Sequence, residues 1–212
     1  MTFVPNEGPL ADYQHEFNHS MLQLVAVPIG EPQDITFRAL ECLKNSSILI
    51  LEERKEGSRL LRGYGISGKE LYQLNEHSTP EDLQVLAKLC ASTEVALITD
   101  AGTPGFCDPG AHLVHLCRKQ NIPVKSLPGA SSLMMLLSLS SQRLDQFVFR
   151  GFLPAENEAR SKALLDLRRE NRALVLMDTP YRLQKMIGEI STHFPDRRVL
   201  LGLDFTQASE YI

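Results

Sequence analysis

The sequence contains no apolar run that reaches the roughly 18 residues needed to span a membrane. It also has no excess of basic residues, because 22 Lys and Arg stand against 26 Asp and Glu, giving a formal net charge of -4. A broadly basic surface of the kind that coats nucleic acid is therefore excluded, although a local basic patch still permits an RNA substrate. The 212 residues suffice for one large core or two small domains.

Cysteine is sparse, and the four cysteines are too far apart to form a CxxC pair. Together with the lack of a signal peptide, this predicts reduced thiols in a cytoplasmic protein. We expect no metal site. His112 and His115 share a helix face and Cys107 and Cys117 are near, but a regular helix points Cys117 away from one histidine, and no second ligand pair follows.

Three common signatures of ligand and catalytic sites are also missing. The loop after the first predicted strand has only Gly30, so it is not a GxGxxG dinucleotide fingerprint. The stretch 65–70 resembles a P-loop only superficially, because its spacing is wrong and no Ser or Thr follows Lys69. A GxSxG nucleophile elbow does not occur.

The most informative stretch runs from Val95 to Gly110. Its first five residues, Val95–Thr99, form an apolar run of strand length, which predicts a strand buried on both faces of a parallel sheet. The next eleven residues contain three Gly and two Pro, more than a strand-to-helix turn of two to six residues needs. Because ligands bind outside the carboxyl ends of strands in α/β sheets, we expect this loop to contact a ligand.

Strands and helices alternate along the rest of the chain, which predicts an α/β fold. We expect an extension over residues 1–20, an N-terminal α/β domain over 21–128 and a C-terminal α/β domain over 129–212. Loops of ligand-binding type follow strands in both halves, at 28–30, 100–110, 128–132, 178–180 and 204–206. If these strand edges face each other, the site is a cleft between the two domains.

Two local features are also predicted. Asp34 is well placed as the N-cap of the first helix. The apolar run Val199–Leu203 reads as the last strand of the chain.

For several polar residues the sequence allows two alternative roles. The charged run 52–56 is either a solvated helix start or part of a cleft. Asp100 and Asp108 are either a carboxylate pair for acid–base chemistry or caps of backbone donors in their own loop. Ser131 and Ser132 precede a helix, where they either bind a polar or anionic group or simply cap that helix.

Four stretches together resemble a known family: Val27-Pro-Ile-Gly with Asp34-Ile-Thr, Asp100-Ala-Gly-Thr-Pro-Gly with Asp108-Pro-Gly, Pro128-Gly-Ala-Ser-Ser, and Gly151-Phe-Leu-Pro with Thr179-Pro-Tyr-Arg. Their order and spacing resemble the tetrapyrrole methylase superfamily of S-adenosylmethionine-dependent methyltransferases. The chain is most similar to the branch of bacterial 16S rRNA ribose 2′-O-methyltransferases. The resemblance implies two α/β domains with a cofactor cleft between them, S-adenosylmethionine as cofactor, rRNA or the small ribosomal subunit as substrate, and a homodimer.

The same resemblance implies the cofactor-binding residues, namely Pro28, Asp100, Gly102, Thr103, Phe106, Ser131, Ser132, Met177, Leu203 and Asp204. The segment from Gly102 takes the place of the family's Gly-Asp-Pro cofactor loop, so Thr103 and Phe106 are expected to contact the cofactor largely through their backbone. Met177 and Leu203 are expected to flank the adenine, with the following aspartate nearby. The two serines should meet the polar end of the cofactor, and the proline should close one wall.

The chain departs from the family pattern after its second predicted strand. The rRNA branch usually carries an acidic-Asp-Thr-Arg run there, whereas this chain reads Glu52-Glu53-Arg54-Lys55. The usual basic C-terminal extension is not present, and the chain ends at Ile212, where the family continues into a further strand. The expectation is either a shortened chain or a compact paralogue.

A hydroxyl acceptor requires a general base, and we expect it to be Asp108 or Glu53. Lys55 would either lower the pKa of that base or hold a phosphate. Two other functions stay open: methylation of a small molecule such as a tetrapyrrole-like macrocycle, and cofactor binding without catalysis.

Overall fold

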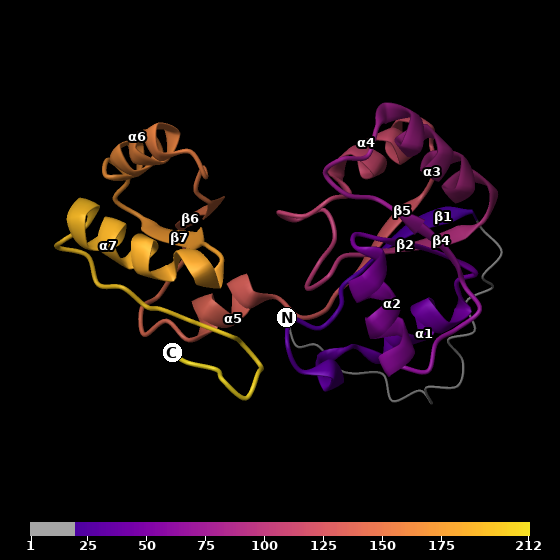
Figure 1. Cartoon of the computed structure of the whole chain (residues 1–212), viewed down its shortest axis with the longest axis horizontal. Helices are drawn as coiled ribbons and strands as arrows, with labels where there is room; N and C mark the ends of the chain where they lie inside the picture. Colours follow the sequence, from indigo (N-terminus) through magenta and orange to yellow (C-terminus); the bar gives the residue numbers. More distant parts are fainter. Residues whose placement is uncertain (1–19) are drawn as a thin grey trace, which may run out of the picture. The chain divides into compact units, whose positions relative to one another are not determined.

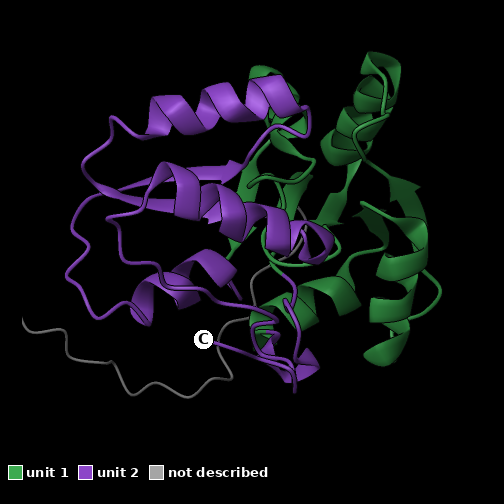
Figure 2. Cartoon of the chain, turned by 60° about the vertical axis from the view of Figure 1, so that its left-hand side comes forward, with its two compact units in different colours: residues 1–26, 36–128 green, residues 27–35, 129–212 purple. Residues whose placement is uncertain are grey.

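The computed structural model describes residues 20–212, and these residues form two compact units (Figures 1 and 2). Among them, unit 1 holds residues 20–26 and 36–128, and unit 2 holds 27–35 and 129–212. The predicted α/β class is confirmed, because parallel strands alternate with seven α-helices in the described part of the chain. The extension expected over residues 1–20 lies outside the described residues, apart from Ser20.

Unit 1 is built on a parallel sheet of five strands in the order β3-β2-β4-β1-β5. The strands are β1 (Met21–Val25), β2 (Ile48–Leu51), β3 (Glu70–Gln73), β4 (Glu94–Ile98) and β5 (Val124–Leu127). The central strand β4 pairs with β1 on one side and β2 on the other, and it is buried from Val95 to Ile98. This confirms the prediction that the apolar run beginning at Val95 is a strand covered on both faces.

Helices cover both faces of this sheet. Figure 1 shows α3 (Pro80–Ser92) and α4 (Ala111–Lys119) on one side, with α1 (Phe37–Asn45) and α2 (Arg54–Gly63) on the other. Under α3 and α4, Leu86 and Cys117 pack with Ile50 and Leu97 of the sheet. Burial on both faces explains why the inner strands β2 and β4 are apolar along nearly their whole length, whereas the edge strands β3 and β5 carry exposed polar residues.

The predicted cap of the first helix is wrong. Helix α1 begins at Phe37, and the Oγ1 atom of Thr36 accepts a hydrogen bond from the N–H of Ala39 at 3.2 Å. Asp34 instead ends the short 3₁₀ helix η2 (Pro32–Asp34). The next residue, Ile35, is extended, so the chain leaves the helical conformation before Thr36 restarts it.

Unit 2 is smaller and rests on a parallel pair of strands, β6 (Phe147–Phe152) and β7 (Ala173–Met177). Its helices are α5 (Ser132–Ser138), α6 (Asn157–Leu167) and α7 (Leu183–His193), with the 3₁₀ helix η3 (Pro180–Arg182) before α7. Leu153, Leu164, Met186 and Phe194 form its core.

The strand predicted at Val199–Leu203 is wrong. The run forms no strand, and only Leu203 makes a single antiparallel bridge, to Tyr211. Val199 is 58% exposed, so its side chain is not enclosed as in a buried strand. An apolar run becomes a strand only where a neighbour supplies hydrogen-bond partners, and the described residues provide just that one bridge.

The segment 27–35 belongs to unit 2, although the sequence groups it with the first domain. Gly30 explains this, because a Cβ atom there would lie 2.6 Å from the carbonyl oxygen of Phe205. The N–H of Glu31 also donates to the Oγ1 atom of Thr206 at 2.8 Å. Only glycine permits so close a backbone approach, which ties the two segments together.

A buried arginine holds unit 2 together. The side chain of Arg160 is 1% exposed, and its guanidinium donates to Glu189 at 2.8 Å and to Asp178 at 2.8 Å. A third donor reaches the carbonyl oxygen of Pro154 at 3.4 Å. Arg160 is thus the shared partner of the buried Asp178 and the partly buried Glu189, while Arg182 lies 3.9 Å from Asp178 as a second, longer ion pair.

We predict that Arg160→Met lowers the free energy of unfolding of unit 2 by about 3 kcal/mol, because it removes the closest cation from the buried Asp178 and the partly buried Glu189. Urea unfolding of the full chain, followed by circular dichroism, measures this loss. Arg168→Met is the matched control, since Arg168 is exposed and should cost less than about 0.5 kcal/mol. Equal losses in the two variants would contradict the role of the buried arginine.

Candidate functional site

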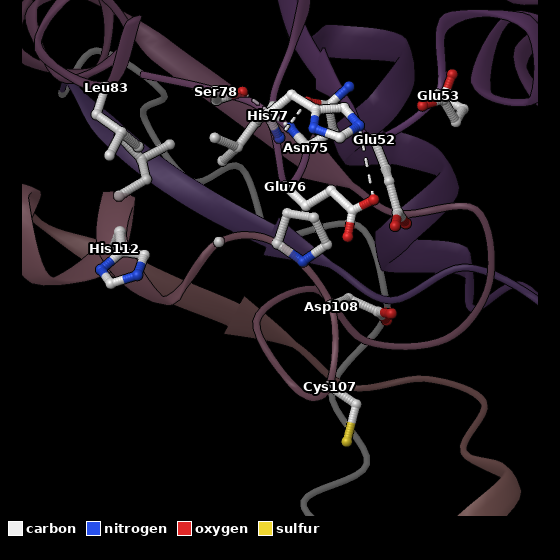
Figure 3. A pocket seen from close by; sticks show the side chains of 14 residues that line it. Glu52, Glu53, Asn75, Glu76, His77, Ser78, Leu83, Cys107, Asp108 and His112 are labelled. Atoms are coloured by element: carbon white, nitrogen blue, oxygen red, sulfur yellow. Dashed lines mark hydrogen bonds and ion pairs between the residues drawn. The ribbon is translucent and has the colours of Figure 1, made fainter. Parts of the chain in front are cut away.

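A cavity of about 600 Å³ lies at the carboxyl edge of the sheet in unit 1 (Figure 3). Three loops line it, those that follow β2, β3 and β4. Its polar side chains include Glu52, Glu53, Glu76, His77 and Asp108. Figure 3 shows the carboxylates of Glu52, Glu76 and Asp108 turned toward the same space. The cavity therefore has an acidic lining.

The loops after β2 and β4 are joined by a reciprocal pair of hydrogen bonds, which we call the carboxylate clasp. The N–H of Asp100 donates to the Oε2 atom of Glu52 at 3.2 Å, and the N–H of Glu53 donates to the Oδ1 atom of Asp100 at 3.3 Å. The side-chain amide of Gln73, at the end of β3, donates to the backbone oxygen of Glu52 at 3.0 Å. Asp100 thus caps a donor of another loop, not of its own as one reading of the sequence has it.

The loop 100–110 is held in a conformation that demands glycine. Gly105 and Gly110 have φ angles of 79° and 135°, and the N–H of Gly105 donates to the carbonyl oxygen of Pro109 at 3.1 Å. A Cβ atom at Gly110 would lie 3.1 Å from the side chain of Leu97 and 3.2 Å from the backbone nitrogen of Gly105. Cys107 also adopts a left-handed φ of 63° without being glycine. The loop is therefore a fixed turn that holds the neighbouring Asp108 against the cavity.

The acidic groups of this edge disfavour one another's ionisation. Burial raises the pKa of Asp108 to about 6, and the charges of Glu52 and Asp100 add to this, while a hydrogen bond from Thr99 opposes it. The pKa values of Glu52 and Asp100 are also raised, first by burial. Three carboxyl groups with raised pKa values thus share one region, and that of Asp108 is raised to about 6.

The run 52–56 is partly a cavity lining and partly an exposed helix start, so each of the two predictions for it holds for some of its residues. Glu52 and Glu53 line the cavity, whereas Arg54 begins helix α2 and Lys55 is exposed on it. The two residues predicted as alternative bases, Glu53 and Asp108, therefore line one cavity. The charges that act on Asp108 are carboxylates and raise its pKa, so nothing assigns Lys55 the task of lowering it.

A second cavity, of about 990 Å³, lies within unit 2. Its lining includes four of the residues that the resemblance assigns to the cofactor: Ser132, Met177, Leu203 and Asp204. Ser131 does not line this cavity. Its side chain caps α5 by accepting a hydrogen bond from the N–H of Met134 at 3.4 Å, as the simpler reading predicts.

The other residues that the resemblance assigns to the cofactor are divided between unit 1 and unit 2. Gly102, Thr103 and Phe106 belong to the loop 100–110 of unit 1, where the N–H of Phe106 donates to the carbonyl oxygen of Thr103 at 3.4 Å. The Phe106 side chain is 47% exposed. Pro28 belongs to the segment of unit 2 that contains Gly30.

Sequence reasoning assigned no role to two residues that the structure singles out. Glu52 makes half of the carboxylate clasp, and the only hint in the sequence was its place in a charged run after a strand. Thr179 lines the cavity of unit 2, and its Oγ1 atom is buried with no hydrogen-bond partner among the described residues. A buried hydroxyl without a partner is costly in a folded protein, so this unpaired group is an unusual feature beside the cavity.

No group of three His, Cys, Asp or Glu side chains within residues 20–212 is arranged to hold a metal ion. Of the residues considered for zinc, His112 lines the acidic cavity, while Cys117 is buried under α3 and α4. No helix in the described part of the chain is both long and apolar enough to cross a membrane.

Comparison with known proteins identifies the family. The sequence profile of the Tetrapyrrole (Corrin/Porphyrin) Methylases matches residues 21–212. A protein of Haemophilus influenzae named ribosomal RNA small subunit methyltransferase I is 37% identical over 194 residues, which cover 91% of this chain and 68% of that protein. The protein of the same name in Vibrio cholerae is 35% identical over 214 residues, covering 99% of this chain and 69% of that protein. The chain thus spans about two thirds of the length of these relatives.

Solved structures agree on the fold. A cobalt precorrin-4 methyltransferase superposes with a TM-score of 0.63 at 17% identity, covering 91% of this chain and 84% of that one. A uroporphyrin III C-methyl transferase of Thermus thermophilus gives 0.60 at 19% identity, covering 90% and 86%. With the profile match over residues 21–212 and relatives more than a third identical, the chain belongs to the tetrapyrrole (corrin/porphyrin) methylase family.

Proposed function

We propose that this protein transfers a methyl group from S-adenosylmethionine to the 2′-hydroxyl of a ribose in 16S rRNA. The names of its relatives support the rRNA substrate, since they cover most of this chain at 35–37% identity. The observation that carries the proposal is the acidic cavity at the carboxyl edge of unit 1, where Asp108 has a pKa of about 6. The proposal includes a cytoplasmic homodimer, as the family resemblance implies.

The residues proposed to hold the cofactor fit its chemistry. In the cavity of unit 2, Met177 and Leu203 offer apolar surface for an adenine, and Asp204 offers a carboxylate for ribose hydroxyls. The partnerless hydroxyl of Thr179 adds a polar group to the same lining. When bound, the cofactor supplies an electrophilic methyl group on a sulfonium.

Asp108 is the residue best suited to take the proton of the acceptor hydroxyl. With a pKa of about 6 it is ionised at neutral pH, yet it holds a proton more tightly than an ordinary carboxylate. The carboxylate clasp keeps Glu52 and Asp100 beside it, so the basicity is built into the loops. Orienting the acceptor before the transfer is worth roughly 7–11 kcal/mol in well-positioned reactions. Glu53, which lines the same cavity, is the alternative base.

The acidic cavity disfavours the two other functions. Tetrapyrrole precursors carry peripheral carboxylates, which Glu52 and Asp108 would repel. A protein that only binds the cofactor has no need for a carboxylate with a raised pKa beside the cofactor loop. A ribose hydroxyl is neutral, so it escapes this penalty as long as the flanking phosphates stay outside the cavity.

The proposed reaction is tested by mass mapping of small-subunit rRNA methylation in cells with and without the gene for this protein. We expect one ribose methyl group to be lost when the gene is removed and restored by the purified protein acting on the undermethylated particles. An unchanged methylation pattern, together with methylation of a tetrapyrrole precursor in vitro, would reject the rRNA substrate.

We predict that Asp108→Asn slows turnover by at least about 10²-fold while leaving cofactor affinity nearly intact, because the amide cannot accept the proton. Single-turnover methylation and calorimetric binding of the cofactor measure the two effects separately. Glu53→Gln is the matched control, and it should retain most of the activity. The reverse ranking of the two variants would make Glu53 the base, and parallel loss of rate and cofactor affinity would make Asp108 structural.

The pH profile should report the same carboxyl cluster. Activity needs ionised Asp108, so we expect the rate to fall as the pH drops through about 6. Glu52→Gln removes a negative neighbour, which lowers the pKa of Asp108 and shifts this acidic limb to lower pH. Glu81→Gln, an exposed change on α3, should leave the limb in place. An unmoved limb in Glu52→Gln would show that Asp108 does not control it.

A folding measurement checks the same pKa independently. A raised carboxyl pKa stabilises the folded protein below its ordinary value near 4, and this stabilisation is lost as the pH rises to about 6. Asp108→Asn removes the effect. The unfolding free energy of this variant, relative to wild type, should therefore increase by about 1–3 kcal/mol between pH 4 and 6 and stay constant above. Urea unfolding at several pH values gives this difference, and a flat difference would contradict the raised pKa.

A further inference from the structure

Helix α2 presents a row of three cations on its exposed face, which we call the basic ridge. Lys55, Arg59 and Arg62 are spaced i, i+4 and i+7, so they lie along one side of the helix. All three are exposed, while Gly57 and Leu61 on the other side are buried. A Cβ atom at Gly57 would lie 2.9 Å from Leu51, so α2 is pressed against β2 and its ridge faces away from the core.

The charge of this helix is opposite to that of the chain. Arg54–Gly63 contains four basic residues and one acidic residue, whereas the chain carries a formal net charge of -4. Arg59 contacts Glu56 at 3.4 Å, but its side chain is 78% exposed, so this pair neutralises little. Within the described residues, neither Lys55 nor Arg62 forms an ion pair. The ridge is therefore a local positive surface on an acidic protein.

The arrangement works against the helix itself. Like charges three or four residues apart destabilise a helix by about 0.2–0.5 kcal/mol per pair, and the ridge contains two such pairs. A helix face that serves only solubility usually intersperses both signs of charge. The repulsion is relieved when an anion lies along the ridge, which favours a binding role.

The position of the ridge indicates what kind of anion it binds. Helix α2 follows directly on Glu52 and Glu53, which line the acidic cavity, so the ridge runs outward from the edge of that cavity. The eight residues from Lys55 to Arg62 extend about 10 Å at about 1.5 Å per residue, long enough to contact more than one phosphate of a nucleic-acid strand. A polymer with neutral sugars and bases but a charged backbone suits a negative cavity beside a positive ridge.

We infer that the basic ridge of Lys55, Arg59 and Arg62 binds the phosphate backbone of a single-stranded RNA segment whose ribose enters the acidic cavity. This inference rests on the proposed rRNA substrate and adds the surface that positions it. Phosphate contacts of this kind fix the register of the nucleic acid and carry no sequence preference. They release counterions, so the logarithm of the binding constant falls linearly with the logarithm of the salt concentration, with a slope set by the number of phosphate contacts.

The test compares two double variants of the full chain. Arg59→Gln with Arg62→Gln removes two charges of the ridge, and Arg168→Gln with Arg169→Gln removes two exposed arginines of unit 2. The probe is a short single-stranded oligoribonucleotide, and its Kd is measured by fluorescence anisotropy at several salt concentrations. We expect the ridge variant to bind about 15-fold more weakly at 0.15 M salt, with the salt slope reduced by about 1.4. The control should bind within about twofold of wild type.

Two further readouts separate a binding role from a folding defect. The ridge variant should be as stable as wild type or slightly more so, because it loses both like-charge pairs. In methylation assays on undermethylated small subunits, its KM for the particle should rise while its affinity for S-adenosylmethionine stays unchanged. Lower stability together with weakened cofactor binding would overturn the ridge as an RNA contact.

The inference and the proposed reaction can fail separately. If wild type methylates the particles but the ridge variant binds RNA like the control, the ridge is a solvated face and the reaction stands. In another outcome, wild type methylates no ribosomal RNA, while the ridge variant binds RNA more weakly than wild type. In that case the ridge is an RNA-binding surface and the proposed reaction is wrong. If both double variants lose the same RNA affinity, the net charge of the protein explains the loss, and the ridge is not a specific RNA-binding surface.

Discussion

The geometry of the candidate site depends on two carboxylates that each accept a hydrogen bond from the other's loop. Glu52 and Asp100 lie 48 residues apart in the sequence, yet their side chains and backbones join the ends of β2 and β4. Neighbouring negative charges repel one another, so such a cluster needs backbone donors to hold it. The buried parallel sheet supplies those donors, because it brings the carboxyl ends of its strands to one edge. Burial raises the pKa of Asp108 to about 6, and the nearby charges of Glu52 and Asp100 add to this rise.

Unit 2 uses a buried cation for a similar purpose. Arg160 fixes Asp178 at the end of β7, and the next residue, Thr179, lines the larger cavity with its hydroxyl unpaired. The hydrogen bonds of the arginine therefore also orient the chain where it lines this cavity. In both units, charged groups set the position of a loop, and the apolar core sets the position of the strand before it.

Features that depend only on residues close together in the sequence were predicted well. The five apolar residues from Val95 gave a buried strand, and the Gly-rich and Pro-rich stretch after it gave a rigid loop. Predictions that needed a partner from elsewhere fared worse. Val199–Leu203 is apolar enough for a strand, but strand formation requires an adjacent backbone, and local composition does not reveal one. The cap of α1 moved from Asp34 to Thr36, since a short 3₁₀ turn comes first.

The order of apolar runs, turns and motifs along the chain was enough to specify an α/β protein and its family. The spacing of apolar residues and the residue types of the loops can both be read from short stretches of sequence. It also named Asp108 and Glu53 as candidate bases, although it had no means of ranking them. Folding made the ranking possible: the pKa of Asp108 depends on burial and on charges from a distant loop. Folding likewise gathered Lys55, Arg59 and Arg62 into one face and left the hydroxyl of Thr179 without a partner. Electrostatic energies depend on distances through space, and only the tertiary structure supplies those distances.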